Sequence, residues 1–178
     1  MPTILLSAAT LLRAARRSRD NGGMTTLEFS DSVVVAASPE DVYAVVSDVT
    51  RTGEWSPICQ ACWWNEPDGG GVGSTFTGRN VTPDRTWETV STVAVAEPGR
   101  EFAWVVGDNF VRWGYTLEAV DGGTRLTENW NFLPDGIALF HRKFGDSAQE
   151  QIDTRSKAAL DGIPRTLAAI KRIIESES

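Results

Sequence analysis

The sequence predicts an α+β fold that consists of one seven-stranded antiparallel sheet and a long C-terminal helix. Three observations lead to this prediction. One strand pattern precedes two short helix patterns, six further strand patterns alternate with turn sequences, and a stripe of apolar residues with helical spacing runs to the end of the chain. A chain of 178 residues is long enough for one domain with a sizeable core and short for two.

Residues 1–23 differ in composition from the rest of the chain. An apolar run over residues 4–12 precedes a cluster of arginines, whereas a secretory signal carries its positive charge first. The run is also far shorter than the roughly 20 residues that span a bilayer. We expect a flexible leader over residues 1–23 and a single domain over residues 24–178. The helical spacing of the apolar residues leaves an interfacial amphipathic helix open as an alternative.

The first strand and the first helix are predicted by adjoining signals. Residues 27–37 are rich in β-branched side chains, which favour strands. Ser38 can cap a helix, Pro39 suits its first turn, and the acidic residues that follow complement the helix dipole. A second short helix or turn is expected over residues 48–55, and Pro57 ends it.

Six further strands are expected before the chain returns to helix. Each is separated from the next by Gly, Pro, Asp or Asn residues that form turns. Such short and regular spacing is typical of an antiparallel meander. The predicted strands cover residues 59–66, 74–81, 86–96, 101–106, 111–120 and 125–133.

The C-terminal part of the chain has helical spacing again. Apolar residues within 137–144 share one face, and residues 147–150 (Ser-Ala-Gln-Glu) form a capping box that predicts a second helix start. This second helix is the longest in the chain. Pro164 should kink it or split it in two, because proline removes one intrahelical hydrogen bond and clashes with the preceding turn.

The composition excludes several classes of function. A net charge of −7 and a pI near 4.8 oppose binding to nucleic acid, which needs a basic face. One His and two Cys cannot complete a structural zinc site, and the sequence contains no P-loop, G-x-S-x-G or H-E-x-x-H motif. We therefore expect no metal, no cofactor and no membrane span. Cys59 and Cys62 are expected to be structural thiols in a reducing cytosol, so the predicted location is cytoplasmic.

Several segments resemble the motifs of one large superfamily. They cover residues 33–43, 49–57, 97–102, 112–115 and 122–128. In this order, the domain resembles the START-like, or SRPBCC, superfamily, in particular its branch of polyketide cyclases, dehydrases and lipid-transport proteins. The resemblance implies a helix-grip fold, in which a curved antiparallel sheet wraps around the C-terminal helix. It does not separate binders, carriers and enzymes, which share this fold.

Alternation along two adjacent strands places Glu128 on an inward, apolar face. The odd-numbered positions of 111–120 are apolar or aromatic, and Glu128 shares the parity of the apolar residues within 125–133. If residues 121–124 close the hairpin, the facing pairs are Leu117 with Glu128, Tyr115 with Trp130 and Trp113 with Phe132. A buried, unpaired carboxylate is costly and has a raised pKa, so Glu128 must reach the cavity mouth, have a partner or be functional.

Three residues are candidates for catalysis. Glu128 and Tyr115 are placed to act together as a general acid and base. The alternative for Glu128 is a solvated or Arg-paired residue near the rim of the sheet. His141, the single imidazole of the chain, is either a third proton-transfer group or a rim residue of its helix.

Aromatic residues are expected to line a cavity between the sheet and the C-terminal helix. Each of them has the alternative of a simple core residue, because a core uses the same side chains. Asn80 is expected to donate a hydrogen bond to a ligand carbonyl, or else to lie near a loop. The predicted ligand-binding residues are Trp55, Phe76, Asn80, Trp87, Trp104, Trp113, Trp130, Phe132, Phe140 and Phe144.

Two functions of different class follow. The favoured one is a binding or carrier protein for a hydrophobic small molecule, such as a lipid, a polyketide or an aromatic metabolite, because aromatic residues are abundant and catalytic groups are scarce. The alternative is a cyclase, aromatase or dehydratase in which Tyr115, Glu128 or His141 moves a proton. An interaction module that acts through its acidic surface is a third option. The sequence leaves the oligomeric state open.

Overall fold

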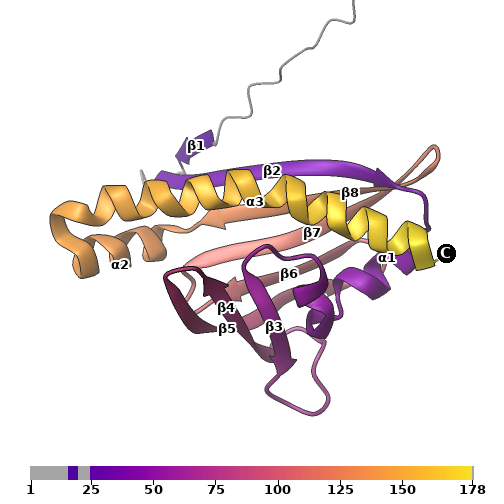
Figure 1. The fold of residues 1–178 in the computed structure, drawn as a ribbon, viewed down its shortest axis with the longest axis horizontal. Coiled ribbons are helices and arrows are strands. Elements are labelled where there is room, and N and C mark those ends of the chain that lie inside the picture. The colour runs from indigo at the N-terminus through magenta and orange to yellow at the C-terminus, as the bar shows by residue number, and fades with distance from the viewer. Residues whose placement is uncertain (1–15, 20–24, 178) are drawn as a thin grey trace, which may run out of the picture.

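The protein folds around one antiparallel sheet of eight strands (Figure 1). The computed structural model describes residues 16–19 and 25–177. The strands lie in the order β1-β2-β8-β7-β6-β5-β4-β3. Their bounds are β1 Arg16–Arg19, β2 Thr25–Val35, β3 Cys59–Trp64, β4 Thr75–Thr82, β5 Arg85–Glu97, β6 Glu101–Val106, β7 Val111–Val120 and β8 Gly123–Phe132.

The seven strands that the sequence predicts are confirmed as β2 to β8. β1 is an additional strand that pairs with β2 at the edge of the sheet. It lies within residues 1–23, so the boundary expected near residue 24 is not the edge of the sheet. The rest of the predicted leader, including its apolar run, lies outside the described residues.

The two short helices after β2 begin where the capping residues predict them. α1 (Pro39–Val46) follows Ser38, whose Oγ accepts a hydrogen bond of 3.2 Å from the backbone N–H three residues later. η1 (Val49–Glu54), a 3₁₀-helix, follows Asp48, whose carboxylate accepts a hydrogen bond of 3.0 Å from the N–H two residues later. These caps direct the chain back toward the sheet, and Trp55 is buried at the end of η1.

Two α-helices form the C-terminal part of the fold. α2 (Pro134–Phe144) is joined by the short η2 (Gly145–Ser147) to α3 (Ala148–Glu177). The predicted capping box is not formed, because Ser147 Oγ donates instead to the carbonyl of the last residue of α2 at 2.9 Å. α3 is continuous through Pro164, so a split into two helices is not observed. Proline removes a single intrahelical hydrogen bond, and buried residues on either side of it hold both halves against the sheet.

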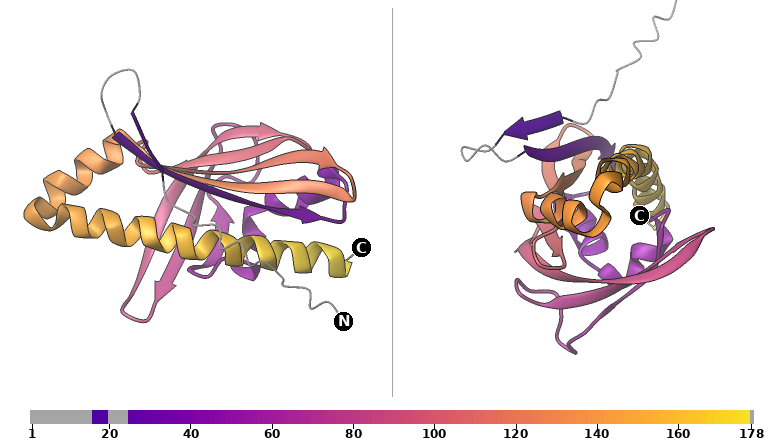
Figure 2. Two further views of the ribbon diagram at one scale, coloured as in Figure 1. Left: turned by 90° about the horizontal axis from the view of Figure 1, so that it is seen from above. Right: turned by 90° about the vertical axis from the view of Figure 1, so that its left-hand side faces the viewer.

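α3 lies along the concave face of the sheet, which curves around it (Figure 2). It packs mainly on β2 and β8. Its buried side chains join the apolar residues of these strands in the larger of two hydrophobic clusters. The arrangement is the helix-grip fold that the resemblance implies. Within the described residues, none of the helices is long and apolar enough to cross a membrane.

The β7–β8 hairpin has a register two residues away from the predicted one. Val120 pairs with Gly123, so the loop contains only two residues. Gly123 follows the turn with a φ of 138°, and it lies so close to β2 that a Cβ there would be 2.0 Å from the carbonyl oxygen of Val35. The observed pairs are Leu117 with Leu126, Tyr115 with Glu128, Trp113 with Trp130 and Val111 with Phe132. A shift of two residues leaves every side chain on its predicted face, but it places the carboxyl group directly opposite the phenol.

Candidate functional site

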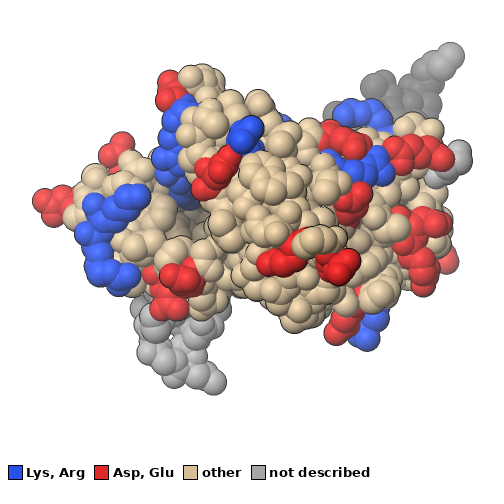
Figure 3. Space-filling view, turned by 90° about the horizontal axis from the view of Figure 1, so that it is seen from below, with Lys and Arg blue, Asp and Glu red and all other residues tan. Residues whose placement is uncertain are grey.

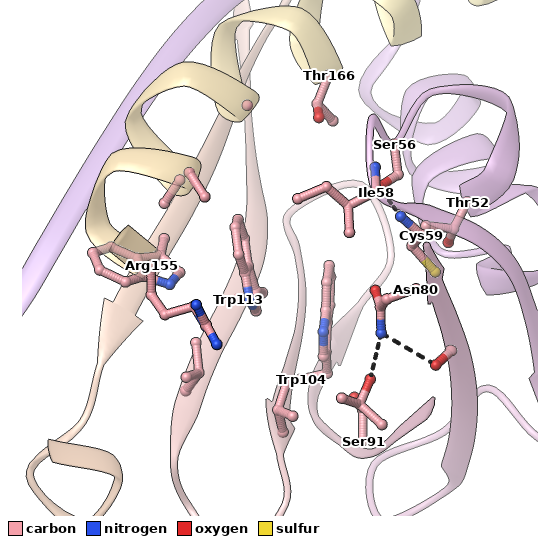
Figure 4. A pocket seen from close by; sticks show the side chains of 18 of the residues that line it. Thr52, Ser56, Ile58, Cys59, Asn80, Ser91, Trp104, Trp113, Arg155 and Thr166 are labelled. Atoms are coloured by element: carbon pink, nitrogen blue, oxygen red, sulfur yellow. Dashed lines mark hydrogen bonds between the residues drawn. The ribbon is translucent and has the colours of Figure 1, made fainter. Parts of the chain in front are cut away.

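A cavity of about 510 Å³ lies between α3 and the concave face of the sheet. Strands β3 to β8 form its floor and walls, and η1, α2 and α3 complete the enclosure. Figure 4 looks into this cavity, with Trp104 and Trp113 standing side by side on adjacent strands. Its volume is within the range of small-molecule binding sites, which is roughly 300–1,000 Å³.

The cavity brings together almost all of the candidate residues. Every predicted ligand-binding residue lines it, from Trp55 on the sheet side to Phe140 and Phe144 on α2. Tyr115 and Glu128 line it as well. His141 does not line the cavity. Its side chain is exposed on α2, although Phe140 and Phe144 on the same helix line the cavity.

Aromatic rings from neighbouring strands form a continuous wall. The ring centroids of Trp104 lie 5.8 Å from Tyr115 and 6.0 Å from Phe76. Trp113 and Trp130 are 6.4 Å apart. These separations are typical of offset and edge-to-face aromatic packing, which stabilises each pair beyond the burial of its surface. The wall is therefore apolar and held in place by its own contacts.

Glu128 is buried in this wall and has no hydrogen bond or ion pair with any residue that the structure describes. Only 4% of the residue is exposed, and its Oε2 atom is buried with no hydrogen bond. Its strand neighbours are Tyr115 on β7 and Asp31 on β2. Burial raises the pKa of the Glu128 carboxyl well above its ordinary value, which favours the neutral acid. The alternative of a solvated or Arg-paired residue at the sheet rim is therefore wrong.

Tyr115 and Trp55 complete a polar group at the Glu128 end of the cavity. Tyr115 is 3% exposed, and burial, together with the charge that Glu128 can carry, raises the pKa of its phenol well above the usual value. The Trp55 indole opposes this effect, although its geometry falls short of a hydrogen bond and its Nε1 is buried without a partner. Trp55 and Glu128 line the cavity, but Trp55 Nε1 and Glu128 Oε2 are themselves shielded from it and have no partner within the described residues, which is costly.

Asn80 lines the cavity on the opposite side of Trp104 from Arg155 (Figure 4). Its Nδ2 donates to the carbonyl of Gly78 and to Oγ1 of Thr89, each at 3.3 Å. The amide nitrogen is therefore occupied. This leaves Oδ1 as the atom with which Asn80 could meet a ligand, and the expected donation to a ligand carbonyl stays a prediction.

Cys59 and Cys62 lie on the same face of β3 and both line the cavity. Residues three apart on a regular strand point to opposite faces, but a β-bulge between Cys59 and Ala61 shifts the register by one. The two free thiols are 3.2 Å apart, and Gly78 leaves room for both. Their hydrogen bond lowers the pKa of Cys62 and raises that of Cys59. The described residues contain no group of three or more metal-ligating side chains.

Sequence reasoning missed the basic and small polar residues of the cavity. Arg85, Lys143 and Arg155 line it, although charged residues in helices and at strand starts are expected to be solvated. Ser91 and Thr89 also line it. The signal that could have found these two is their parity with Trp87, a predicted cavity residue on the same strand.

The chain is similar to known proteins over most of its length. Residues 26–168 match the family described as polyketide cyclase / dehydrase and lipid transport. The solution structure of a polyketide-cyclase-like protein from Corynebacterium glutamicum is 57% identical, with a TM-score of 0.64; the match covers 84% of this chain and 92% of that one. No protein with a curated function matches the sequence.

More distant structures share the fold. The di-domain ARO/CYC StfQ from the steffimycin biosynthetic pathway is 15% identical with a TM-score of 0.65, and the match covers 85% of this chain and 51% of that one. A protein from Thermus thermophilus is 10% identical with a TM-score of 0.66, over 85% of this chain and 99% of that one. Because both identities are low, these similarities extend to the fold alone.

Proposed function

Because the chain belongs to the polyketide cyclase / dehydrase and lipid transport family, we propose that it binds a hydrophobic small molecule, such as a lipid, a polyketide or an aromatic metabolite, between the sheet and α3. The observation that carries the proposal is the aromatic-walled cavity of about 510 Å³. Its apolar wall supplies the burial that stabilises a hydrophobic ligand, and its few polar groups orient it. The free thiols support a reducing, cytoplasmic setting.

The protein as isolated tests the proposal first. Native mass spectrometry followed by organic extraction should reveal an apolar molecule that copurifies with the chain. If the protein is isolated empty, binding is measured by titration with N-phenyl-1-naphthylamine, a neutral aromatic probe whose fluorescence rises in apolar surroundings. We expect saturable binding at one site for each chain.

A pair of alanines on α3 offers a matched control. Ala158 and Ala168 are both exposed, but only Ala158 lines the cavity. Ala158→Trp should obstruct the cavity and weaken probe binding, whereas Ala168→Trp should leave binding unchanged. Equal binding by the two variants, or the absence of any probe binding, would contradict the proposal.

A second function is favoured by the unpaired Glu128 carboxyl beside Tyr115. A neutral carboxylic acid in an apolar cavity can give its proton to a carbonyl or departing hydroxyl oxygen of a bound substrate and then recover a proton from a neighbouring carbon. Such proton transfer is what a cyclase, aromatase or dehydratase requires. Tyr115 lies on the facing strand, where its hydroxyl can hold the same oxygen. His141 is exposed and lies outside the cavity lining, so we leave it out of this mechanism.

Glu128→Gln separates the two functions. Glutamine keeps the size of the side chain but cannot transfer the proton, so an enzyme should lose turnover of its substrate by about 10²–10⁴-fold while ligand binding persists. A carrier should bind its ligand with little change. Turnover that survives the substitution would remove Glu128 from any mechanism.

A further inference from the structure

Three basic side chains stand at the rim of the cavity. Arg85 at the start of β5 and Lys143 at the end of α2 are exposed, and Arg155 on α3 is half-buried; all three line the cavity. Figure 3 shows a hollow in one face of the molecule with both basic and acidic side chains around it. Apart from the buried Glu128, the charged residues that line the cavity are thus all basic, in a protein with a net charge of −7.

Each of these cations lies over an aromatic ring of the cavity. Arg85 Cζ lies 4.0 Å from the ring centroid of Trp87, and Arg155 Cζ lies 5.8 Å from that of Phe140. Lys143 Nζ is 5.4 Å from the ring of Phe144. Cation–π contacts hold the charged groups against the wall and leave their N–H donors available.

Within the part of the chain that the structure describes, Arg85, Lys143 and Arg155 make no ion pair and donate no side-chain hydrogen bond. Arg142, Arg165 and Arg172 make no ion pair within the described residues either, but they do not line the cavity. The remaining basic side chains that the structure describes pair with carboxylates. These are Arg51, Arg79, Arg100, Arg112, Arg125, Lys157 and Lys171. Among the described basic side chains without an ion pair, Arg85, Lys143 and Arg155 are the ones that line the cavity.

The surroundings of Arg155 disfavour its positive charge. Burial and the nearby charge of Arg85 both lower the pKa of its guanidinium. Two like charges that share a half-buried rim without a counterion are unfavourable until an anion joins them. In Figure 4 the Arg155 side chain reaches from α3 into the cavity on the side of Trp113.

We propose that the ligand is an anionic amphiphile whose apolar body fills the aromatic cavity and whose carboxylate, phosphate or sulfonate head lies at the rim between Arg85, Lys143 and Arg155. The proposal rests on the binding function above and adds the chemical class of the ligand. A guanidinium suits such a head, because its planar donors match the oxygens of a carboxylate or phosphate.

The opposite end of the cavity sets the orientation of the ligand. Burial raises the pKa of Glu128 because this apolar region disfavours a negative charge, so it disfavours the charged head of a ligand there as well, whereas an uncharged carbonyl or hydroxyl group suits it. The anionic head is thus directed to the rim, and any polar group at the far end of the ligand is uncharged.

Two probes that differ by one charge test the inference. N-phenyl-1-naphthylamine is neutral, and 8-anilino-1-naphthalenesulfonate has the same ring system with a sulfonate. We expect the sulfonate to bind about tenfold tighter, which corresponds to one hydrogen bond to a charged group. Arg155→Gln should remove most of this preference, measured as the ratio of the two probe affinities in the same variant. Arg85→Gln should reduce the preference as well.

Arg172→Gln is the matched control. Arg172 is an exposed residue of the same helix that does not line the cavity, so its loss should leave both affinities unchanged. Equal affinity of the two probes, or equal loss of both in Arg155→Gln, would overturn the inference while leaving hydrophobic binding intact. If neither probe binds, the binding function itself fails, and this inference fails with it.

Competition identifies the head group. Dodecanoate, dodecyl phosphate and dodecanol share one alkyl chain and are used to displace the bound neutral probe. We expect the two anions to displace it at concentrations about tenfold lower than the alcohol. If dodecanoate displaces the probe at the lowest concentration, the ligand is a free acid. If dodecyl phosphate does so, the ligand is phosphorylated. An alcohol that competes as well as the anions contradicts the proposal.

Discussion

The two halves of the sheet differ in what covers their inner faces. β2 and the adjoining part of β8 are sealed by α3, where Val35, Leu126 and Leu167 are almost completely buried in the larger hydrophobic cluster. The inner faces of β4, β5 and β6 instead face the cavity, and only a small cluster lies beneath them. We call these the closed half and the open half.

The difference separates stability from binding. In the closed half, every apolar contact adds to the stability of the fold. The open half leaves part of its apolar surface for a ligand to cover. Polar groups follow the same division: Asn80, Ser91 and the two thiols are found on the open half. β8 is the boundary, since Leu126 lies under α3 and Glu128 lines the cavity.

The largest expected effect is a loss of stability in the closed half. Leu167 is 2% exposed and does not line the cavity, so Leu167→Ala creates a void that nothing fills. We expect the free energy of unfolding to fall by about 2–5 kcal/mol, measured by urea denaturation. Neutral-probe affinity of the folded fraction should not change. A loss below about 1 kcal/mol would show that the closed half is not tightly packed.

Glu128→Gln should raise stability in a pH-dependent way. Burial raises the pKa of Glu128 in the folded state above that of the unfolded chain, which is about 4.3. Between about pH 4.3 and the raised pKa of the folded state, the folded protein keeps a proton that the unfolded chain loses. The wild type therefore loses stability as the pH rises through this range. The variant should be similar to the wild type near pH 4 and more stable at pH 7 and above. Thermal unfolding of both proteins across this range is the measurement.

A pH-independent difference between Glu128→Gln and the wild type would contradict this prediction. Asp31 faces the same position from β2 and Tyr115 from β7, so Asp31→Asn and Tyr115→Phe are the appropriate controls. Neither should reproduce the pH-dependent gain, because the cause is burial of the Glu128 carboxyl itself.

In the open half, Trp87→Ala should affect binding more than folding. Trp87 is half-buried and lines the cavity. Its removal should cost about 1 kcal/mol of stability, less than Leu167→Ala, but weaken binding of the neutral probe. Calorimetric titration alongside urea denaturation measures both quantities. Equal stability losses for the two substitutions would remove the distinction between the halves.

The fold could be predicted because its signals are local. Ser38 and Asp48 cap the helices that follow them, and turn residues separate strands whose faces follow from alternation. The register of the β7–β8 hairpin could not be predicted, because a two-residue shift preserves the same alternation. The structure adds a close approach of Gly123 to Val35, two residues that are distant in the sequence.

For the candidate site, the sequence predicted which face of the sheet a residue occupies but not which residues of other elements lie near it. Alternation placed Glu128 on the inner face, but its lack of a partner depends on what α3 and η1 bring near it. Arg85 and Arg155 carry no sequence signal, because an exposed charge on a strand or helix looks the same whether or not a cavity lies beneath it. The two thiols share one face only because of a β-bulge between Cys59 and Ala61, and no local sequence motif predicts that bulge.

The smallest expected effect concerns the two thiols. The rates at which they are alkylated should differ from each other and should depend on bound probe. Cys62 has the lowered pKa, so iodoacetamide should alkylate Cys62 before Cys59, as peptide mass spectrometry can show. Because both thiols line the open half, saturation with the neutral probe should slow the reaction. In urea the two cysteines should react alike and the probe should give no protection. Equal labelling rates with and without probe in the folded protein would show that the ligand does not reach this wall, and the open half would then end before β3.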